Sequence, residues 1–435
     1  MLHLLRLSVF LQMSILLEPL YNQLAFDLNF ITNNDTLNEN KIFTSNMNIQ
    51  QVVYNALISN TLEDPEHFVI VNLADIIHQY NHWKEKLPTI MPYYAIKSNA
   101  NPVIIKLLHT LGCGFDVASM KEIQTVLSCG IEPYKMVYAN PCKSIQYIEF
   151  AKEAGVNLLV VDCICEMEKM ALHYPEADIL LRIKGDDSYS LCKFNTKYGL
   201  DMEEMEGIFK KAVLLGSCIK GVSFHIGSSC KNKNVFKDVI RKCKYVIELG
   251  NSYGFNMNIL DIGGGFLGDI DNVFFDEVAE VINEAIDLNF TKTEVENMRM
   301  IAEPGRYFCS ASHTLVTSVV CTKTKVDSKT GERTMVYYIS DGVYGIFSGA
   351  MFDYATFEIE VFNPDHPTKV EKNEPVYYSI IFGPTCDSLD IINKGCMLPL
   401  LEVGDKLIIR NIGAYSIESA TEFNGFPIPE KYYIL

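Results

Sequence analysis

The chain has 435 residues, of which 48% are hydrophobic, and a formal net charge of −17. This length allows a large core and two domains, and the acidic balance argues against a nucleic-acid partner. The 13 cysteines follow no CxxC or Cys/His metal spacing, so we expect no metal site and a reducing compartment, the cytoplasm.

The first 46 residues differ from the rest of the chain. Leu7–Leu17 is an apolar run that resembles part of a secretion signal, but Glu18 and Pro19 interrupt it and it is too short to span a bilayer. Residues 31–50 are polar and rich in asparagine. We therefore predict a weakly ordered extension over residues 1–46 and no membrane partner, with secretion as the alternative.

Two short elements precede the repeating part of the chain. His67–Asn72 is an apolar run typical of a strand, and residues 73–86 have the periodicity of an amphipathic helix. Residues 91–97 form the next predicted strand, and Asn101-Pro102 then opens a helix with proline in its first turn. Lys97 is therefore expected at the carboxyl end of a strand.

Between residues 88 and 305, β-rich runs alternate with segments of helical periodicity. Capping sequences at Ser119–Glu122 and Asp201–Glu204 mark where two of the helices begin. The eight predicted strands are residues 91–97, a run ending at 115–116, then 136–139, 158–161, 179–183, 221–225, 258–262 and 300–303. This alternation predicts an α/β fold with a TIM-like (β/α)8 barrel over residues 88–305. An open, doubly wound sheet is the alternative.

The pattern changes after Arg306. Long β-type runs with little helical periodicity follow at residues 314–325, 333–341, 356–362, 376–382 and 405–411. We therefore predict a second, β-rich domain of sandwich or barrel type over residues 306–435. Because the strand at 67–72 lies outside the barrel count, we expect segment 47–87 to contribute it to this C-terminal domain.

Polar residues and glycines follow the predicted barrel strands, at the face where barrel enzymes hold their active sites. The glycine run Gly263–Gly265 and Arg306 follow the last two strands, where such barrels commonly bind phosphate. Phosphate beside a lysine and a carboxylate favours pyridoxal phosphate. Lys97 would condense with the aldehyde, Glu303 would pair with the pyridine nitrogen, and His225 would stack on the ring. When each residue is considered alone, the alternatives are that Lys97 is a solvated loop lysine and that His225 is a structural histidine.

These motifs give the sequence a family resemblance. It resembles the eukaryotic ornithine decarboxylases of the alanine-racemase-like fold type over nearly all of residues 48–435. The matching motifs are Pro92–Lys97 (PYYAIK), Gly114–Ser119 (GFDVAS), Val137–Lys143 (VYANPCK), Ser223–Ser228 (SFHIGS), Asp261–Gly265 (DIGGG), Ala302–Arg306 (AEPGR), Asp341–Gly345 (DGVYG), Gly383–Asp387 (GPTCD) and Asn411–Tyr415 (NIGAY). One departure is Ser229, where family members commonly have glycine.

The resemblance implies a cofactor site built mainly on the barrel. Lys97 would be the Schiff-base lysine, acting with His225 and Cys386 as the catalytic residues. The implied contacts of pyridoxal 5′-phosphate are Lys97, Asp116, Arg182, His225, Ser228, Gly263, Gly264, Gly265, Glu303, Gly305, Arg306 and Tyr415.

The resemblance also implies the reaction, which converts L-ornithine to putrescine and carbon dioxide. Cys386 would protonate the carbanion carbon, and Asp353 and Asp387 would bind the distal ammonium group, with Tyr344 and Phe423 beside the substrate. Family members form homodimers in which the Gly383–Asp387 loop crosses to the partner subunit, so we expect shared active sites. An antizyme is a possible further partner.

Three other functions remain open at this stage. A non-catalytic regulator like the antizyme inhibitors would be expected to lose cofactor contacts, but Asp116, Arg182 and Arg306 match the enzymes. Another decarboxylase of lysine, arginine or diaminopimelate is also possible, although the diaminopimelate enzymes usually have glutamate at the position of Asp387. An amino-acid racemase would need a second base, typically a tyrosine.

Overall fold

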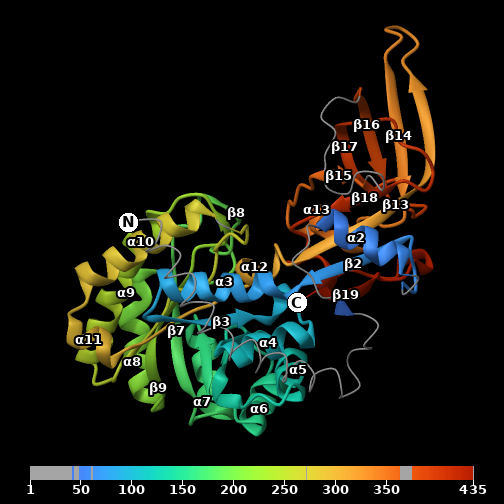
Figure 1. Cartoon of the computed structure of the whole chain (residues 1–435). Helices are drawn as coiled ribbons and strands as arrows, with labels where there is room; N and C mark the ends of the chain where they lie inside the picture. The colour runs from blue at the N-terminus through green and yellow to red at the C-terminus, as the bar shows by residue number, and fades with distance from the viewer. Residues whose placement is uncertain (1–41, 44–48, 60–61, 271, 363–374, 435) are drawn as a thin grey trace, which may run out of the picture.

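The computed structural model describes residues 42–43, 49–59, 62–270, 272–362 and 375–434. They form a closed barrel and, beside it, a domain built on a β-sheet (Figure 1). The predicted fold class is thereby confirmed, and the open doubly wound sheet is excluded. The predicted extension over residues 1–46 lies outside the described residues except for β1 (Ile42–Phe43). No helix among the described residues is both long and apolar enough to cross a membrane.

Eight parallel strands close the barrel. They are β3 (Ile90–Ala95), β4 (Gly114–Val117), β5 (Met136–Tyr138), β6 (Leu158–Val161), β7 (Asp178–Lys184), β9 (Cys218–His225), β11 (Ile259–Asp261) and β12 (Arg299–Ala302). Inward-facing side chains such as Val137, Leu180 and Ile301 pack in one buried cluster that fills the barrel interior. The interior is therefore a packed core, and a binding site can form only at an end of the barrel.

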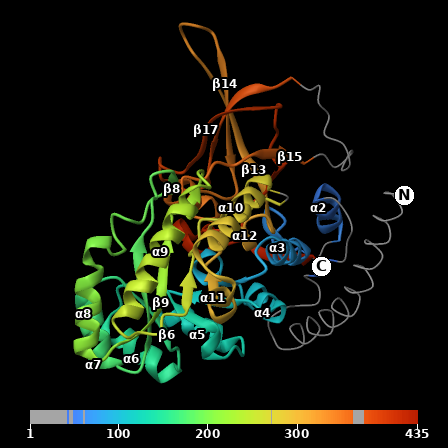
Figure 2. The same ribbon diagram turned by 90° about the vertical axis from the view of Figure 1, so that its left-hand side faces the viewer.

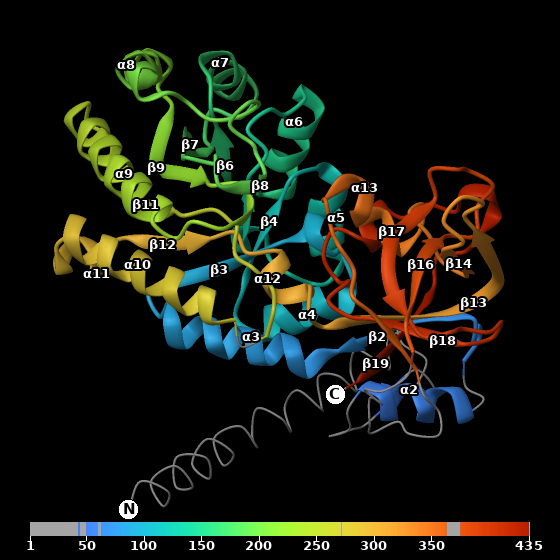
Figure 3. The same ribbon diagram turned by 90° about the horizontal axis from the view of Figure 1, so that it is seen from above.

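Helices follow the barrel strands and surround them (Figure 3). They are α4 (Pro102–Leu111), α5 (Met120–Ser128), α6 (Ile145–Ala154), α7 (Ile164–His173), α8 (Met205–Leu215), α9 (Val235–Ser252), α10 (Val273–Asn289), α11 (Lys292–Asn297) and α12 (Arg306–Cys309). Viewed from the side, α8, α9 and α10 form part of this outer layer (Figure 2).

Local sequence explains where several helices begin. The Asn101 side chain accepts a hydrogen bond from the Val103 amide, and Pro102 occupies the first turn of α4. The predicted capping box at Asp201–Glu204 is present, in the 3₁₀ turn η5 (Met202–Glu204) that leads into α8. At Ser119 the prediction was only partly right, because the Glu122 carboxylate accepts from the Ala118 amide.

The second domain contains a nine-stranded sheet with the order β1-β19-β2-β13-β14-β16-β17, and β18 pairs with β13 and β15. Its strands after the barrel are β13 (His313–Val326), β14 (Arg333–Ile339), β15 (Ile359–Val361), β16 (Tyr377–Phe382), β17 (Ile391–Leu398), β18 (Lys406–Ile409) and β19 (Glu430–Ile434). β2 (His67–Asn72) lies between β19 and β13, so this domain takes strands from both sides of the barrel in the sequence.

Other elements surround these two cores. α3 (Leu73–Lys86) joins β2 to the barrel, and α2 (Ile49–Ile58) packs against the sheet through Val52, Val53 and Ala56 (Figure 3). A two-stranded sheet of β8 (Ser190–Cys192) and β10 (Ser228–Cys230) stands outside the barrel. The remaining turns and short helices are η3 (Ile96–Ser98), η4 (Pro133–Lys135), η6 (Ile346–Ser348), α13 (Gly349–Phe352), η7 (Ile417–Ser419) and η8 (Phe423–Gly425).

Candidate active site

Lys97 lies just beyond the carboxyl end of β3, in the turn η3. Its ammonium donates a hydrogen bond to the Asp116 carboxylate on the adjacent strand β4. Ser98 fixes the turn, since its hydroxyl donates to the Ala95 carbonyl at 2.7 Å and its own carbonyl accepts from the Tyr415 amide at 2.9 Å. Because Tyr415 belongs to the second domain, both domains hold the backbone around Lys97.

Two adjoining cavities meet at Lys97 and share Phe194, His225 and Glu303. The larger, about 420 Å³, also contains Cys192, Ser228, Gly265, Phe266, Gly305, Arg306, Phe352, Asp353, Tyr415, Glu418 and Ser419. The smaller, about 250 Å³, also contains Asp116, Ala118, Ala139, Asn140, Pro141, Arg182 and Tyr198. Most of the residues predicted around the cofactor therefore surround one continuous region at the barrel rim.

Three carboxyl groups are buried together beneath Lys97. They belong to Asp116, Asp261 and Glu303, at the ends of β4, β11 and β12. Burial raises the pKa of Asp261 to about 7, and the Asp116 carboxylate contributes to this rise. Burial, then Asp261 and Asp116, raise the pKa of Glu303 well above its usual range. Within the part of the chain that the structure describes, the Lys97 ammonium forms an ion pair with Asp116, whereas Asp261 and Glu303 form none.

Lys97 and His225 have opposite protonation preferences. Burial alone lowers the pKa of Lys97, but the Asp116 carboxylate, with Tyr415 and Glu303, raises the pKa above its ordinary value. Burial, then the nearby positive charges of Arg182 and Lys97, hold the pKa of His225 well below its usual range. His225 is therefore a neutral imidazole, and its Nδ1 accepts a hydrogen bond from the Gly227 amide at 3.0 Å.

The glycine run after β11 passes very close to neighbouring strand ends. A Cβ atom on Gly263 would lie 2.1 Å from the Phe224 carbonyl oxygen, and one on Gly264 would lie 2.9 Å from Nε2 of His225. Gly263 and Gly265 also have positive φ angles of 63° and 110°. Glycine is therefore required here for packing as well as for any contact with an anion.

Arg306 and Asp353 form an ion pair inside the larger cavity, with Nη2 and Oδ2 2.6 Å apart. The same Nη2 donates to the Ser228 hydroxyl at 3.3 Å, and the guanidinium lies 5.0 Å from the centre of the Tyr415 ring. Nε of Arg306 is buried and has no hydrogen-bond partner among the described residues. Asp353, predicted to bind a substrate ammonium, therefore already shares its charge with the predicted phosphate-binding arginine.

The remaining predicted residues form a separate group on the second domain, which we call the cysteine cluster: Cys386, Asp387, Tyr344 and Phe423. None of them lines the two cavities. The Tyr344 hydroxyl donates to the Asp387 carboxylate, and the Tyr344 and Phe423 rings stack with centres 4.3 Å apart. The Leu389 amide, then the Tyr344 hydroxyl, lower the pKa of Asp387, so its carboxylate is ionised and available to a cation.

Comparison with known proteins gives this arrangement a family. Residues 73–310 match the model of the pyridoxal-dependent decarboxylase, pyridoxal binding domain. Rat ornithine decarboxylase is 37% identical over 382 residues, which cover 86% of this chain and 81% of the relative. The chain belongs to the pyridoxal-dependent decarboxylases.

Two other relatives of this decarboxylase show how far the family extends. Antizyme inhibitor 2 of Xenopus laevis is 36% identical over 385 residues, covering 86% of this chain and 82% of the relative. The crystal structure of the Paramecium bursaria Chlorella virus arginine decarboxylase has a TM-score of 0.82 and 29% identity, covering 89% of this chain and all of that one.

The cavity residues of this decarboxylase fit pyridoxal phosphate, the predicted cofactor. Asp116 Oδ1 and Arg306 Nε are buried polar atoms without protein partners, which a polar ligand can satisfy. Asp261 and Glu303 form no ion pair with any described residue, and a protonated pyridine nitrogen would place a cation beside them. The glycine run and Arg306 provide backbone and guanidinium groups suited to a phosphate.

Some cavity residues were not predicted from the sequence. Phe194 contacts His225 edge to face, with ring centres 4.9 Å apart, and the Cys192 thiol lies 3.7 Å from Asp353 Oδ1. Glu418 accepts a hydrogen bond from the Ala100 amide at 2.8 Å. Cys192 ends the short strand β8 and Phe194 follows it, both outside the barrel, and Glu418 comes from the second domain. No periodicity in the sequence marks any of the three as facing the barrel.

Proposed function

We propose that this decarboxylase converts L-ornithine to putrescine and carbon dioxide, a reaction of polyamine biosynthesis. The observation that carries the proposal is the larger cavity, in which Lys97, the partner of Asp116, and the Asp353 carboxylate line one space of about 420 Å³. Such a cavity suits an amino acid whose α-amine lies near Lys97 and whose distal ammonium lies near a carboxylate.

Each part of the chain has a defined task in this reaction. Bound pyridoxal phosphate, attached through Lys97, supplies an electron sink for the electron pair left when the bond between Cα and the carboxylate breaks. Glu303 keeps a proton on the pyridine nitrogen, and Arg306, Ser228 and Gly263–Gly265 hold the phosphate. The neutral His225 packs against the ring without adding charge.

Protonation of Cα completes the reaction, and we assign that proton to the Cys386 thiol. Because the cysteine cluster does not line the cavity of its own chain, we propose a homodimer in which each chain supplies Cys386 and Asp387 to the cavity of its partner. Exposed apolar side chains beside both halves support such an interface, among them Phe352 at the cavity and Leu389 next to the cluster, 71% and 60% exposed.

The alternatives differ in what they require of the site. A regulator like antizyme inhibitor 2 needs no cofactor, whereas here Lys97, Asp116, Glu303 and Arg306 all line the two adjoining cavities that meet at Lys97. We therefore favour the enzyme, and propose an antizyme only as a possible partner. We also propose the cytoplasm as its compartment, since the 13 cysteines are all free thiols.

The test is kcat/KM for ornithine, lysine, arginine, diaminopimelate and norvaline on one preparation. A charge-assisted hydrogen bond to the distal ammonium is worth roughly 1.5–3 kcal/mol. Norvaline lacks that group and leaves the carboxylates unpaired. Its kcat/KM should therefore be lower than that of ornithine by on the order of 10⁴-fold, as in other sites built to bind a polar substrate group. Lysine, one methylene longer, should lose about 10–200-fold. A preference for any of the other four compounds would disprove the ornithine assignment.

A further inference from the structure

The loop of residues 421–427, between η7 and β19, borders the cysteine cluster and is exposed along its whole length. It carries Asn424, whose Oδ1 accepts a hydrogen bond from the Cys386 amide at 3.1 Å. Asn424 has a left-handed backbone with φ of 57°, which costs asparagine less than most residues. Because an exposed loop gains little from packing, its position depends on the few hydrogen bonds at its ends.

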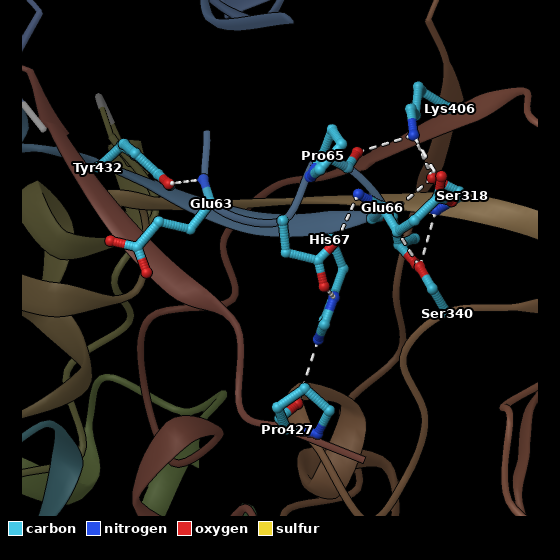
Figure 4. Close-up of polar contacts among 11 residues, drawn as sticks. Glu63, Pro65, Glu66, His67, Ser318, Ser340, Lys406, Pro427 and Tyr432 are labelled. Carbon is cyan, nitrogen blue, oxygen red and sulfur yellow. Dashed lines mark hydrogen bonds and ion pairs between the residues drawn. The ribbon is translucent and has the colours of Figure 1, made fainter. Parts of the chain in front are cut away.

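At its beginning, the loop is held by Tyr344, whose carbonyl accepts from the Thr421 amide at 2.7 Å. At its far end, the ladder between β19 and β2 begins only at Glu430, opposite Phe68. Pro427 and Pro429 have no amide hydrogen, so these two residues cannot donate to an extended ladder. The His67 side chain occupies this position instead, with Nε2 3.1 Å from the Pro427 carbonyl oxygen (Figure 4).

His67 is well placed to hold the loop because its own surroundings are fixed. It is 5% exposed, and its other ring nitrogen lies 3.1 Å from Oδ2 of Asp64. The carbonyl of the preceding residue, Glu66, accepts hydrogen bonds from the Ser318 and Ser340 hydroxyls at 2.7 and 2.9 Å (Figure 4). Lys406 donates to the Pro65 carbonyl at 2.7 Å. The backbone just before His67 is therefore held by the sheet that contains β2, β13, β14 and β18.

Beyond Pro427 the chain is also held by Ile428, which packs against the main hydrophobic core, so the exposed part of the loop ends at Pro427. A cavity of about 590 Å³ lies between His67, Phe426, Pro427 and Pro384, which precedes Cys386 by two residues. Open space behind both the loop and the cysteine segment allows either to move if its hydrogen bonds are lost. A single contact at Pro427 can therefore influence where Asn424 and Cys386 lie.

We propose that His67 is a positioning residue for protonation: through Pro427 it holds the 421–427 loop, and through Asn424 that loop holds the Cys386 amide. The proposal rests on the proposed function of Cys386 as the donor of the proton to Cα. A proton delivered instead to C4′ of the cofactor gives, after hydrolysis by water, an aldehyde and the aminated cofactor. Product choice therefore reports the position of Cys386.

The experiment compares His67→Leu, His67→Gln and Cys386→Ala in the cofactor-loaded protein with ornithine. We expect Cys386→Ala to divert most turnovers to the aldehyde. His67→Leu should raise the diverted fraction about 2- to 10-fold over the native protein, the range set by losing one hydrogen bond. His67→Gln keeps a donor within reach of the Pro427 carbonyl and should restore the native product ratio.

Two further variants separate positioning from general stability. Tyr432→Phe removes the nearby hydrogen bond to the Glu63 amide, 2.9 Å in length, which does not involve the loop, and should leave the product ratio unchanged (Figure 4). Asn424→Gly keeps the left-handed backbone but removes the acceptor of the Cys386 amide, and should divert turnover even if His67→Leu folds poorly.

Amide hydrogen exchange of the cofactor-free protein gives an independent readout. The Cys386 amide should exchange faster in His67→Leu than in the native protein or in His67→Gln. A native product ratio in His67→Leu and Asn424→Gly, beside a diverted ratio in Cys386→Ala, would overturn the role of His67. Undiverted turnover in Cys386→Ala would instead refute the proposed function of Cys386, and unchanged exchange at Cys386 would still refute the His67 proposal.

Discussion

Lys97 and Cys386, the two residues expected to do the covalent chemistry, have opposite surroundings. Lys97 lies in a cavity built by the ends of several barrel strands, pairs with the buried Asp116 and is held by backbone from both domains. Cys386 is exposed on a loop of the second domain, and its amide donates one hydrogen bond to Asn424.

This difference indicates how the two halves of the site are made. The rim of the barrel is preorganised within one chain, because parallel strand ends meet there whatever the rest of the molecule does. The cysteine cluster has its groups in order but no cavity to act in. Under the proposed function, one chain therefore supplies the cofactor-binding residues and relies on its partner for the proton donor.

The largest effect is expected when Lys97 and Cys386 are inactivated in separate chains. Putrescine formation by Lys97→Ala and by Cys386→Ala should each fall by about 10²–10⁴-fold, the usual effect of removing a group that transfers protons or forms a covalent bond. Mixing the two inactive proteins should restore about a quarter of native activity, since half of random dimers are mixed and each has one intact site of two.

The mixed sample is measured after subunit exchange has been verified with differently tagged chains. A mixture of Lys97→Ala with the double variant Lys97→Ala/Cys386→Ala is the matched control, because no dimer in it has a complete site. If exchange is complete and the first mixture stays inactive, the sites are not shared between chains.

A second prediction concerns the carboxyl cluster, where one substitution should lower activity but raise stability. Glu303→Gln removes the partner of the pyridine nitrogen and should lower kcat by about 10²–10³-fold, as loss of a preorganised electrostatic contact does. In the cofactor-free protein the same change should increase the free energy of unfolding at pH 8, because Glu303 is buried beside two other carboxyl groups.

The pH dependence gives the sign of this stability effect. Glu303 titrates near 4.5 when unfolded and at a much higher pKa when folded. Above pH 4.5 the unfolded chain releases a proton that the folded chain keeps, so Glu303 makes the native protein lose stability as pH rises, and the glutamine variant lacks this contribution. The advantage of Glu303→Gln should therefore grow from about pH 4.5 upward in urea titrations. Glu206→Gln, at an exposed helix position, is the control and should change stability little at any pH.

The smallest effect is expected at Ser229, beside the barrel. Ser229 stands where the related enzymes commonly have glycine, and its φ is 53°, in the left-handed region. Ser229→Gly should relieve this backbone strain and raise the free energy of unfolding by up to about 1 kcal/mol, less the entropy that glycine adds to the unfolded chain. Ser188→Gly, at an exposed position without positive φ, should destabilise the protein. A loss of stability in both variants would contradict the strain argument.

The sequence was most informative where geometry follows from strand order. Lys97, Asp116 and Glu303 could be placed together because each follows a barrel strand, and parallel strands of a closed barrel end at one rim. The Arg306–Asp353 ion pair could not be predicted, since Asp353 follows a short helix of the other domain. Strand β17 was missed because most of its side chains are exposed or half-buried and do not alternate.

The place of β2 in the sheet has a consequence for how the protein is made. This strand leaves the ribosome before any part of the barrel, yet its two neighbours are β13, which follows the barrel, and β19, which follows every other described strand. Until then the apolar segment Phe68–Val71 has both edges unpaired, a state that favours aggregation. Nascent chains halted before Glu430 should therefore expose β2 to chaperones, while the barrel, whose strands are continuous in sequence, can already fold.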